Sequence, residues 1–179
     1  MPAAYRPDHT RIAWSGPSWR LRVDTLTRPD GSQTEKGLIE HPGSVVLVPL
    51  RGEQVLMLRQ YRPALAETIL ELPAGTREEA EPWLECAQRE LREETGYRAA
   101  EFTPLGHVWP APGLSSEVMA IYLATGLTPD PLPADFDEEI ELVSLPLANL
   151  VQMALDGQMQ DAKSAIALLR TRHWQQEKS

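Results

Sequence analysis

The sequence predicts an α/β (α+β) fold in which helices pack against a mixed β-sheet. Two observations lead to this prediction. Short apolar stretches with the character of strands recur along the chain between turn signals, and three longer stretches are typical of helices. Because strands and helices follow one another along the chain, we expect the helices to cover the sheet. The 179 residues are enough for a domain with a sizeable core.

The first 42 residues are predicted to form a β extension ahead of the main domain. Residues 18–26 alternate as a strand does, residues 28–32 are a turn signal, and residues 33–40 can return as a second strand. Pro42-Gly43 then breaks the pattern. The chain is therefore divided into a hairpin-like extension, residues 1–42, and a main domain, residues 43–179.

Further strands and three helices are predicted in the main domain. The strands are expected at residues 45–50, 54–60, 68–72, 102–110, 118–125 and 140–144. The helices are expected at residues 82–95, 147–155 and 162–175. Pro82 falls in the first turn of the first helix, where proline is tolerated, and Asp161 is a candidate N-cap of the last. Residues 128–139 are rich in Pro, Asp and Glu and are expected to form a mobile loop.

Composition excludes several functional classes. The net charge of −9 argues against nucleic acid as a partner, because phosphate backbones select basic surfaces. No apolar run is long enough to cross a bilayer, and the N-terminus lacks the apolar core of a signal peptide. The single cysteine, Cys86, fits a reducing compartment. We therefore expect a cytoplasmic protein that binds neither membrane nor nucleic acid.

The stretch GTREEAEPWLECAQRELREETGY, residues 75–97, carries the strongest functional signal. On a helix, Glu90 and Glu94 are one turn apart and Glu93 lies beside them, so three carboxylates share one side. Hard cations such as Mg²⁺ bind one or two carboxylates together with substrate phosphates. This spacing predicts a metal site for a phosphorylated substrate. The alternative, a solvated acidic helix, would not need the glycines found at both ends of the motif.

This stretch resembles the Nudix box, the signature of the Nudix hydrolase family. The fixed positions of that signature are met by Gly75, Glu81, Arg89, Glu90, Leu91, Glu93, Glu94 and Gly96. Tyr97 stands where the family has an aliphatic residue. The resemblance implies a Nudix-type α/β/α sandwich with a mixed sheet.

The metal site can be assigned residue by residue. We expect Glu90 and Glu94 to be direct ligands, and the resemblance assigns a backbone carbonyl ligand to Ala74. Glu93 would hold further metal or a metal-bound water. Arg89 is expected to orient one of these carboxylates through an ion pair. The cofactor implied is Mg²⁺, with Mn²⁺ as an alternative.

The general base is left open by the sequence. In relatives with Glu-Leu-Pro-Ala-Gly before the box, a glutamate on a later loop does this work, and the resemblance points to Glu138 or Glu139. A base on a mobile loop would let the site close before reaction. The alternatives are Glu93 within the box, or an acidic loop without a catalytic role.

Several segments outside the box resemble the ADP-ribose pyrophosphatase branch of the family. They lie at residues 40–43, 59–63, 71–75, 111–117 and 161–164. The branch has an N-terminal β extension that builds a homodimer, which implies the same role for residues 1–42. Arg59 and Arg62 can offer guanidinium groups to phosphate oxygens, although their spacing on a strand can place them on opposite sides. Glu117 could bind ribose hydroxyls, and Trp19 could stack on adenine. The alternatives for these four residues are surface solubility, local backbone bonds and packing.

The resulting functional hypothesis is Mg²⁺-dependent hydrolysis of the diphosphate bond of a nucleoside diphosphate sugar. The best single substrate is ADP-ribose, giving AMP and ribose 5-phosphate. One alternative is another nucleoside diphosphate derivative, such as GDP-mannose, a dinucleotide or an oxidised nucleotide. A second alternative is a sensor that binds ADP-ribose without cleaving it, against which the intact box and the lack of a basic DNA-binding segment both argue.

Overall fold

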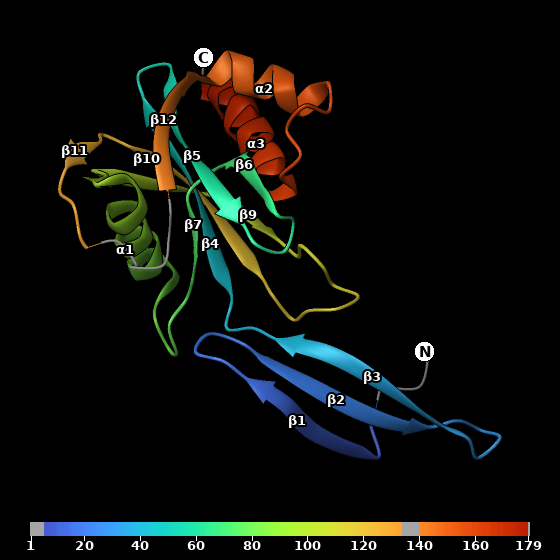
Figure 1. The fold of residues 1–179 in the computed structure, drawn as a ribbon. Coiled ribbons are helices and arrows are strands. Elements are labelled where there is room, and N and C mark those ends of the chain that lie inside the picture. Colours follow the sequence, from blue (N-terminus) through green and yellow to red (C-terminus); the bar gives the residue numbers. More distant parts are fainter. Residues whose placement is uncertain (1–5, 134–139, 179) are drawn as a thin grey trace.

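The computed structural model describes residues 6–133 and 140–178. A small sheet from the N-terminal extension lies at one end of the molecule, and the main sheet with its helices lies at the other (Figure 1). Helix α1 (Trp83–Thr95) covers one side of the main sheet. Helices α2 (Leu147–Leu155) and α3 (Ala162–Lys178) cover the other side. The predicted α/β/α arrangement is therefore confirmed.

The extension is an antiparallel sheet in the order β1 (His9–Ser15), β2 (Arg20–Thr27), β3 (Gln33–Glu40). The predicted hairpin corresponds to β2 and β3, which pair along their full length. Strand β1 was missed because its apolar residues, Ile12, Ala13 and Trp14, are consecutive and so do not alternate with polar positions. The turn after β2 is closed by Asp30, whose carboxylate accepts hydrogen bonds from the backbone N–H and the hydroxyl of Ser32.

Within the described residues, seven strands make up the main sheet, in the order β12-β5-β4-β10-β9 with β6 paired to β5 and β7 paired to β4. Their bounds are β4 Ser44–Arg51, β5 Gln54–Arg62, β6 Glu67–Glu71, β7 Ala74–Thr76, β9 Glu101–Val108, β10 Met119–Thr125 and β12 Ile140–Pro146. Strand β10 runs parallel to β4, whereas the other pairings are antiparallel. The sheet is therefore mixed, as predicted. A separate two-stranded pair joins β8 (Tyr97–Arg98) to β11 (Thr128–Pro129), which opens the segment expected to be a loop.

Strand β4 is the centre of the fold because its two faces belong to two different cores. Val46, Val48 and Leu50 point toward α2 and α3, and Val45 and Leu47 pack with Cys86, Ala87 and Leu91 of α1. This run of apolar residues follows from burial on both faces. The described helices are not long and apolar enough to cross a membrane.

Two backbone hydrogen bonds position the loop that leads into α1. The Leu47 N–H donates to the Pro73 carbonyl at 2.9 Å, and the Arg77 N–H donates to the Gly43 carbonyl at 3.0 Å. Pro82 precedes the helix as its N-cap residue, and Gly96 ends it in the left-handed region at φ 74°. The box motif is thus a strand, loop and helix held against the middle strand of the sheet.

Candidate active site

Arg89 organises the carboxylates of the box. Its Nε and Nη2 donate to the two oxygens of Glu81 at 2.9 and 3.0 Å. Its Nη1 donates to Glu90 at 2.7 Å and to Glu93 at 2.9 Å, and its Nη2 also reaches the Thr76 carbonyl at 3.1 Å. One planar guanidinium therefore fixes three carboxylates and the loop before the helix. The orienting role of Arg89 stays a prediction, and these contacts are compatible with it.

The charges in this cluster act on one another in opposite directions. The hydrogen bonds from Arg89 lower the pKa of Glu81 below its ordinary value, against the effect of burial. The same carboxylates, Glu81 foremost, raise the pKa of Arg89, so this guanidinium stays charged. Burial raises the pKa of the Cys86 thiol, which keeps it protonated and inert. Cys86 is therefore a packing residue in this site.

The strand segment before the box touches the helix directly. The backbone N–H of Ala74 donates to Glu94 Oε2 at 2.8 Å. At Gly75 an added Cβ would lie 1.8 Å from the Cδ atom of Glu90. Gly75 lies within strand β7 and has no positive φ, so no left-handed conformation requires a glycine there. Its hydrogen is required instead because the Glu90 carboxylate occupies the space of a side chain.

The residues present fit a hard divalent cation. Glu90, Glu93 and Glu81 share the single guanidinium of Arg89, so the cluster as a whole is negative. Glu90 is buried, and its oxygens and those of Glu94 are the donor atoms that Mg²⁺ prefers. In the described residues no set of three or more His, Cys, Asp or Glu side chains is already arranged around a common point. Their oxygens are instead engaged by Arg89 and by the Ala74 amide.

The proposed general bases fall into two groups. Glu138 and Glu139 lie outside the described residues. Glu93 is on α1, where its carboxylate accepts a hydrogen bond from Arg89 and its side chain is 23% exposed. It is thus held in place and reachable from solvent.

The two arginines expected to bind phosphate are not brought together. Arg59 is 53% exposed and lies 4.0 Å from Glu141 on the neighbouring strand β12. Arg62 instead forms a two-pronged ion pair with Glu71, with Nε to Oε1 at 2.8 Å and Nη2 to Oε2 at 2.9 Å. Arg62 is therefore fixed by a buried partner, whereas Arg59 projects from the surface.

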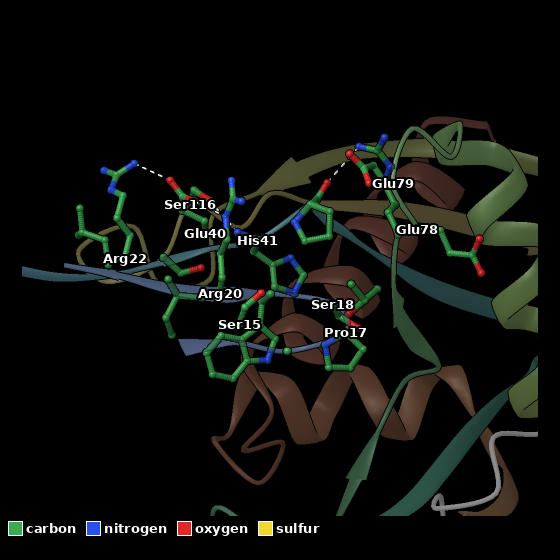
Figure 2. Close-up of a pocket in the computed structure, with 18 of the residues that line it drawn as sticks. Ser15, Pro17, Ser18, Arg20, Arg22, Glu40, His41, Glu78, Glu79 and Ser116 are labelled. Carbon is green, nitrogen blue, oxygen red and sulfur yellow. Dashed lines mark hydrogen bonds and ion pairs between the residues drawn. The ribbon is translucent and has the colours of Figure 1, made fainter. Parts of the chain in front are cut away.

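Trp19 lines a cleft of about 970 Å³ between the extension and the box loop. Figure 2 shows Arg20, Glu40 and His41 on one side of this cleft, with Glu78 and Glu79 across from them. The Trp19 ring also packs against Trp14 with centroids 4.4 Å apart, and it remains 40% exposed. Both predicted fates of this residue, packing and access to a ligand, are therefore compatible with its position.

Glu117 lies near the cleft at the end of the loop after β9. Its Oε1 accepts a hydrogen bond from the Ser44 hydroxyl at 2.7 Å and lies 4.0 Å from His41 Nε2. The His41 backbone N–H donates to the hydroxyl of Ser116, one residue before Glu117. These contacts connect the end of the extension to the loop after β9, and Glu117 contributes to that connection.

The sequence analysis missed two groups that shape the site. Arg77 stacks over the Trp83 ring at 4.1 Å and donates to the carbonyls of Glu81 and Pro42. Trp83 also packs closely against Gly43, where an added Cβ would lie 2.5 Å from the ring. No local sequence pattern predicts this contact, because the two residues are far apart in the chain. The second group surrounds Glu71 and Lys163, which are 92 residues apart.

Comparison with known proteins places the chain in a family. Residues 40–168 match the NUDIX domain model. The chain is 32% identical over 158 residues to an ADP-ribose pyrophosphatase of Bacillus subtilis, covering 87% of this chain and 85% of that protein. It is 33% identical over 162 residues to a methanol dehydrogenase activator of Bacillus methanolicus, covering 89% and 88%.

A solved structure supports the same fold. A crystal structure of an ADP compounds hydrolase superposes with a TM-score of 0.81 and 24% identity, covering 96% of this chain and 94% of that one. The match includes the extension as well as the main domain, since so little of either chain is left out. The sequence motif, the fold and the relatives agree. The chain therefore belongs to the Nudix family, as a pyrophosphatase-type hydrolase similar to the ADP-ribose pyrophosphatases.

Proposed function

We propose that the protein hydrolyses the diphosphate bond of a nucleoside diphosphate sugar, with ADP-ribose as substrate and AMP and ribose 5-phosphate as products. The observation that carries the proposal is the Arg89-centred carboxylate cluster beside a cleft of about 970 Å³. Relatives named for ADP-ribose and for other ADP compounds support this substrate class.

Each part of the site has a proposed task. Glu90, Glu94 and the Ala74 carbonyl would hold Mg²⁺ or Mn²⁺, which when bound clamps the diphosphate and neutralises developing charge. Arg89 keeps Glu90 and Glu93 from repelling each other and sets their direction. A glutamate removes the proton of the attacking water, either Glu93 or one of Glu138 and Glu139.

The substrate is proposed to lie between the box and the extension. Of the two arginines, Arg62 is proposed to contact the phosphate, because Glu71 fixes its direction. The more exposed Arg59 is proposed to contact the outer part of the substrate. The exposed face of Trp19 offers a surface on which the adenine ring can stack. Glu117, already aimed at Ser44 and His41, would accept hydrogen bonds from the ribose hydroxyls.

A second substrate is favoured by a specific comparison. A GDP-mannose pyrophosphatase of Klebsiella pneumoniae is 32% identical over 162 residues, covering 80% of this chain and 78% of that protein. The box is common to both classes, so the residues around the cleft must discriminate between them. This makes GDP-mannose the first competitor to test.

The decisive experiment is product analysis by chromatography. Purified protein is incubated with Mg²⁺ and separately with ADP-ribose, other ADP- and GDP-sugars, dinucleotides and nucleoside triphosphates. We expect ADP-ribose to be converted preferentially to AMP and ribose 5-phosphate. Preferential cleavage of GDP-mannose would move the protein to the competing class. Binding of ADP-ribose without cleavage would favour a sensor.

The carboxylate assignments predict a second result. Glu93→Gln and Glu94→Gln each keep the size of the side chain but remove the charge, so we expect turnover to fall about 100-fold or more with the fold retained. Steady-state kinetics and circular dichroism measure the two quantities. Glu85→Gln, at an exposed position of the same helix outside both the Arg89 cluster and the cleft, is the matched control. Full turnover in both box variants would contradict the site assignment.

The extension is proposed to make the protein a homodimer in the cytoplasm. Every residue of β1 is exposed in the single chain, including Ile12 at 47% and Trp14 at 46%. Apolar side chains gathered on an edge strand are typical of a surface that another chain covers. The lone buried cysteine fits a reducing compartment.

A further inference from the structure

Glu71 is a buried carboxylate that the box motif does not include. Its side chain is 1% exposed, and it lies at the end of β6, just before the segment that leads into the box. A carboxylate this deeply buried is costly unless cations and hydrogen-bond donors surround it. Two cations do so: Arg62 with both prongs of its guanidinium, and the ammonium group of Lys163.

Lys163 belongs to a closed ring of contacts at the start of α3. Its ammonium group donates a hydrogen bond to Glu71 and also lies 3.0 Å from Asp161 Oδ2. Asp161 accepts hydrogen bonds from both the hydroxyl and the backbone N–H of Ser164. The Ser164 hydroxyl oxygen in turn accepts the Leu72 backbone N–H at 2.7 Å. The ring therefore starts at Glu71 and returns to the next residue in the chain.

This ring fixes one end of the segment whose other end touches the box helix. Leu72 is held by Ser164, the Pro73 carbonyl accepts the Leu47 N–H, and the Ala74 N–H donates to Glu94. Figure 1 shows α3 beside β6, on the side of the main sheet opposite α1. The segment thus connects α3 to the carboxylates of α1 across the thickness of the molecule.

We propose that Glu71 and Lys163 are positioning residues for the reaction. Lys163 and its ring set the path of Leu72–Ala74, and with it the Ala74 carbonyl and the Glu94 carboxylate. Glu71 also sets the direction of Arg62, whose side chain is 37% exposed although its partner is buried. The inference rests on the proposed function for the roles of Ala74 and Arg62, but not for the existence of the anchor.

A purely structural role makes a different prediction from a positioning role. A structural ring would contribute to global stability, and its loss would leave the folded molecules fully active. A positioning ring controls local order in a segment next to the reacting atoms. Loss of groups that orient site residues typically costs about 10–100-fold in activity or metal affinity. The two roles therefore separate when local order and kinetics are compared at equal stability.

The test uses Lys163→Met, which removes the charge and keeps an unbranched stem, and Lys163→Arg, which keeps the charge. Val151→Ala is the matched control, because it removes apolar contacts from α2 against the same core without touching the ring. Amide hydrogen exchange by NMR is followed at Leu72 and Ala74 in the absence of substrate. Kinetics use whichever compound of the panel is cleaved.

For Lys163→Met we expect faster exchange at Leu72 and Ala74 than the change in global stability explains, and kcat about 10-fold lower. Lys163→Arg should restore most of the exchange protection at Leu72 and Ala74 and most of kcat. Glu71→Gln should in addition raise KM, because Arg62 loses its anchor. If Lys163→Met does not fold, Ser164→Ala, which removes only the hydroxyl, replaces it.

Exchange and kinetics in Lys163→Met that match Val151→Ala after correction for stability would overturn the proposal. The exchange measurement needs no substrate. It therefore tests whether Lys163 holds Leu72–Ala74 in place even if the panel shows that ADP-ribose is not cleaved. Failure of the proposed function and failure of this inference are thereby distinguished.

Discussion

At the scale of single residues, the site depends on close approach as much as on charge. Gly75 leaves room for the Glu90 carboxylate, and Arg89 holds that carboxylate at 2.7 Å. Neither requirement involves an unusual backbone conformation at Gly75. The motif therefore specifies a space as well as a set of charged groups.

This close approach predicts the effect of one added methyl group. In Gly75→Ala the Cβ would lie 1.8 Å from Glu90 Cδ, so the carboxylate or the strand must move. A displacement of about 1 Å near reacting groups can cost about 100-fold in rate, and we expect a loss of that order. Steady-state kinetics with Mg²⁺ measure it.

The control for this change is Gly37→Ala on β3, where the nearest atom to an added Cβ is 3.7 Å away. It adds the same methyl group at a position without crowding, so activity should stay within about twofold of the wild type. An equal loss of activity in both variants would show that the effect does not come from crowding of the Glu90 carboxylate.

At the scale of elements, ion pairs join neighbouring strands of the extension sheet, β2 and β3. Glu40, the last residue of β3, accepts hydrogen bonds from Arg20 and from Arg22, both at 2.6 Å. Burial raises the pKa of Glu40, but the hydrogen bonds from the two arginines outweigh this, so its pKa is lowered. A carboxylate whose pKa is lower in the folded state stabilises the fold when it is ionised.

This shift predicts how stability changes with pH. The contribution of Glu40 is complete above its unfolded-state pKa, near the ordinary value of 4.5, and is lost as the pH falls through the lower folded-state pKa. We therefore expect Glu40→Gln to lower the melting temperature at about pH 6–7, and the difference from the wild type to shrink toward about pH 3. Differential scanning fluorimetry across this range measures it.

Glu35→Gln is the control for the pH experiment. Glu35 is also on β3 and pairs with Arg11 at 3.5 Å, but both side chains are more than half exposed. Exposed pairs contribute little to stability, so its melting temperature should follow the wild type at every pH. A difference for Glu40→Gln that stays constant down to the lowest pH would contradict the linkage.

At the scale of the whole molecule, the extension leaves apolar surface that the single chain does not cover. Ile12, Trp14 and Trp19 are each 40% or more exposed, and all three belong to the extension. The cleft that contains Trp19 is lined by the extension and by the box loop together. Assembly through the extension would therefore affect the walls of the proposed substrate site.

We expect the purified protein to have about twice its chain mass of 20.0 kDa in light scattering after size exclusion at micromolar concentration. Ile12→Glu places a charge on the exposed face of β1 and should shift the mass to that of the monomer. Leu155→Glu, at a position 66% exposed on α2, is the control and should leave the mass unchanged. A wild type with the mass of one chain at every concentration would rule out the dimer.

The sequence by itself determined the parts of the protein that depend on local spacing. Helical periodicity places Glu90, Glu93 and Glu94 on one side of the helix. Gly96 ends that helix because the residue after its last turn adopts the left-handed conformation, which glycine adopts readily. Apolar alternation and turn residues located most strands within a few residues. These features are encoded within one or two turns or a single hairpin, so no knowledge of distant residues was needed.

Only the tertiary structure decided which distant side chains meet. It paired Arg62 with Glu71, and it brought Lys163 into contact with Glu71 from 92 residues away. It also revealed β1, whose exposed residues carry no apolar period. The physical reason is the same in each case: such contacts depend on how the sheet and helices pack, and packing leaves no periodic signal in the chain.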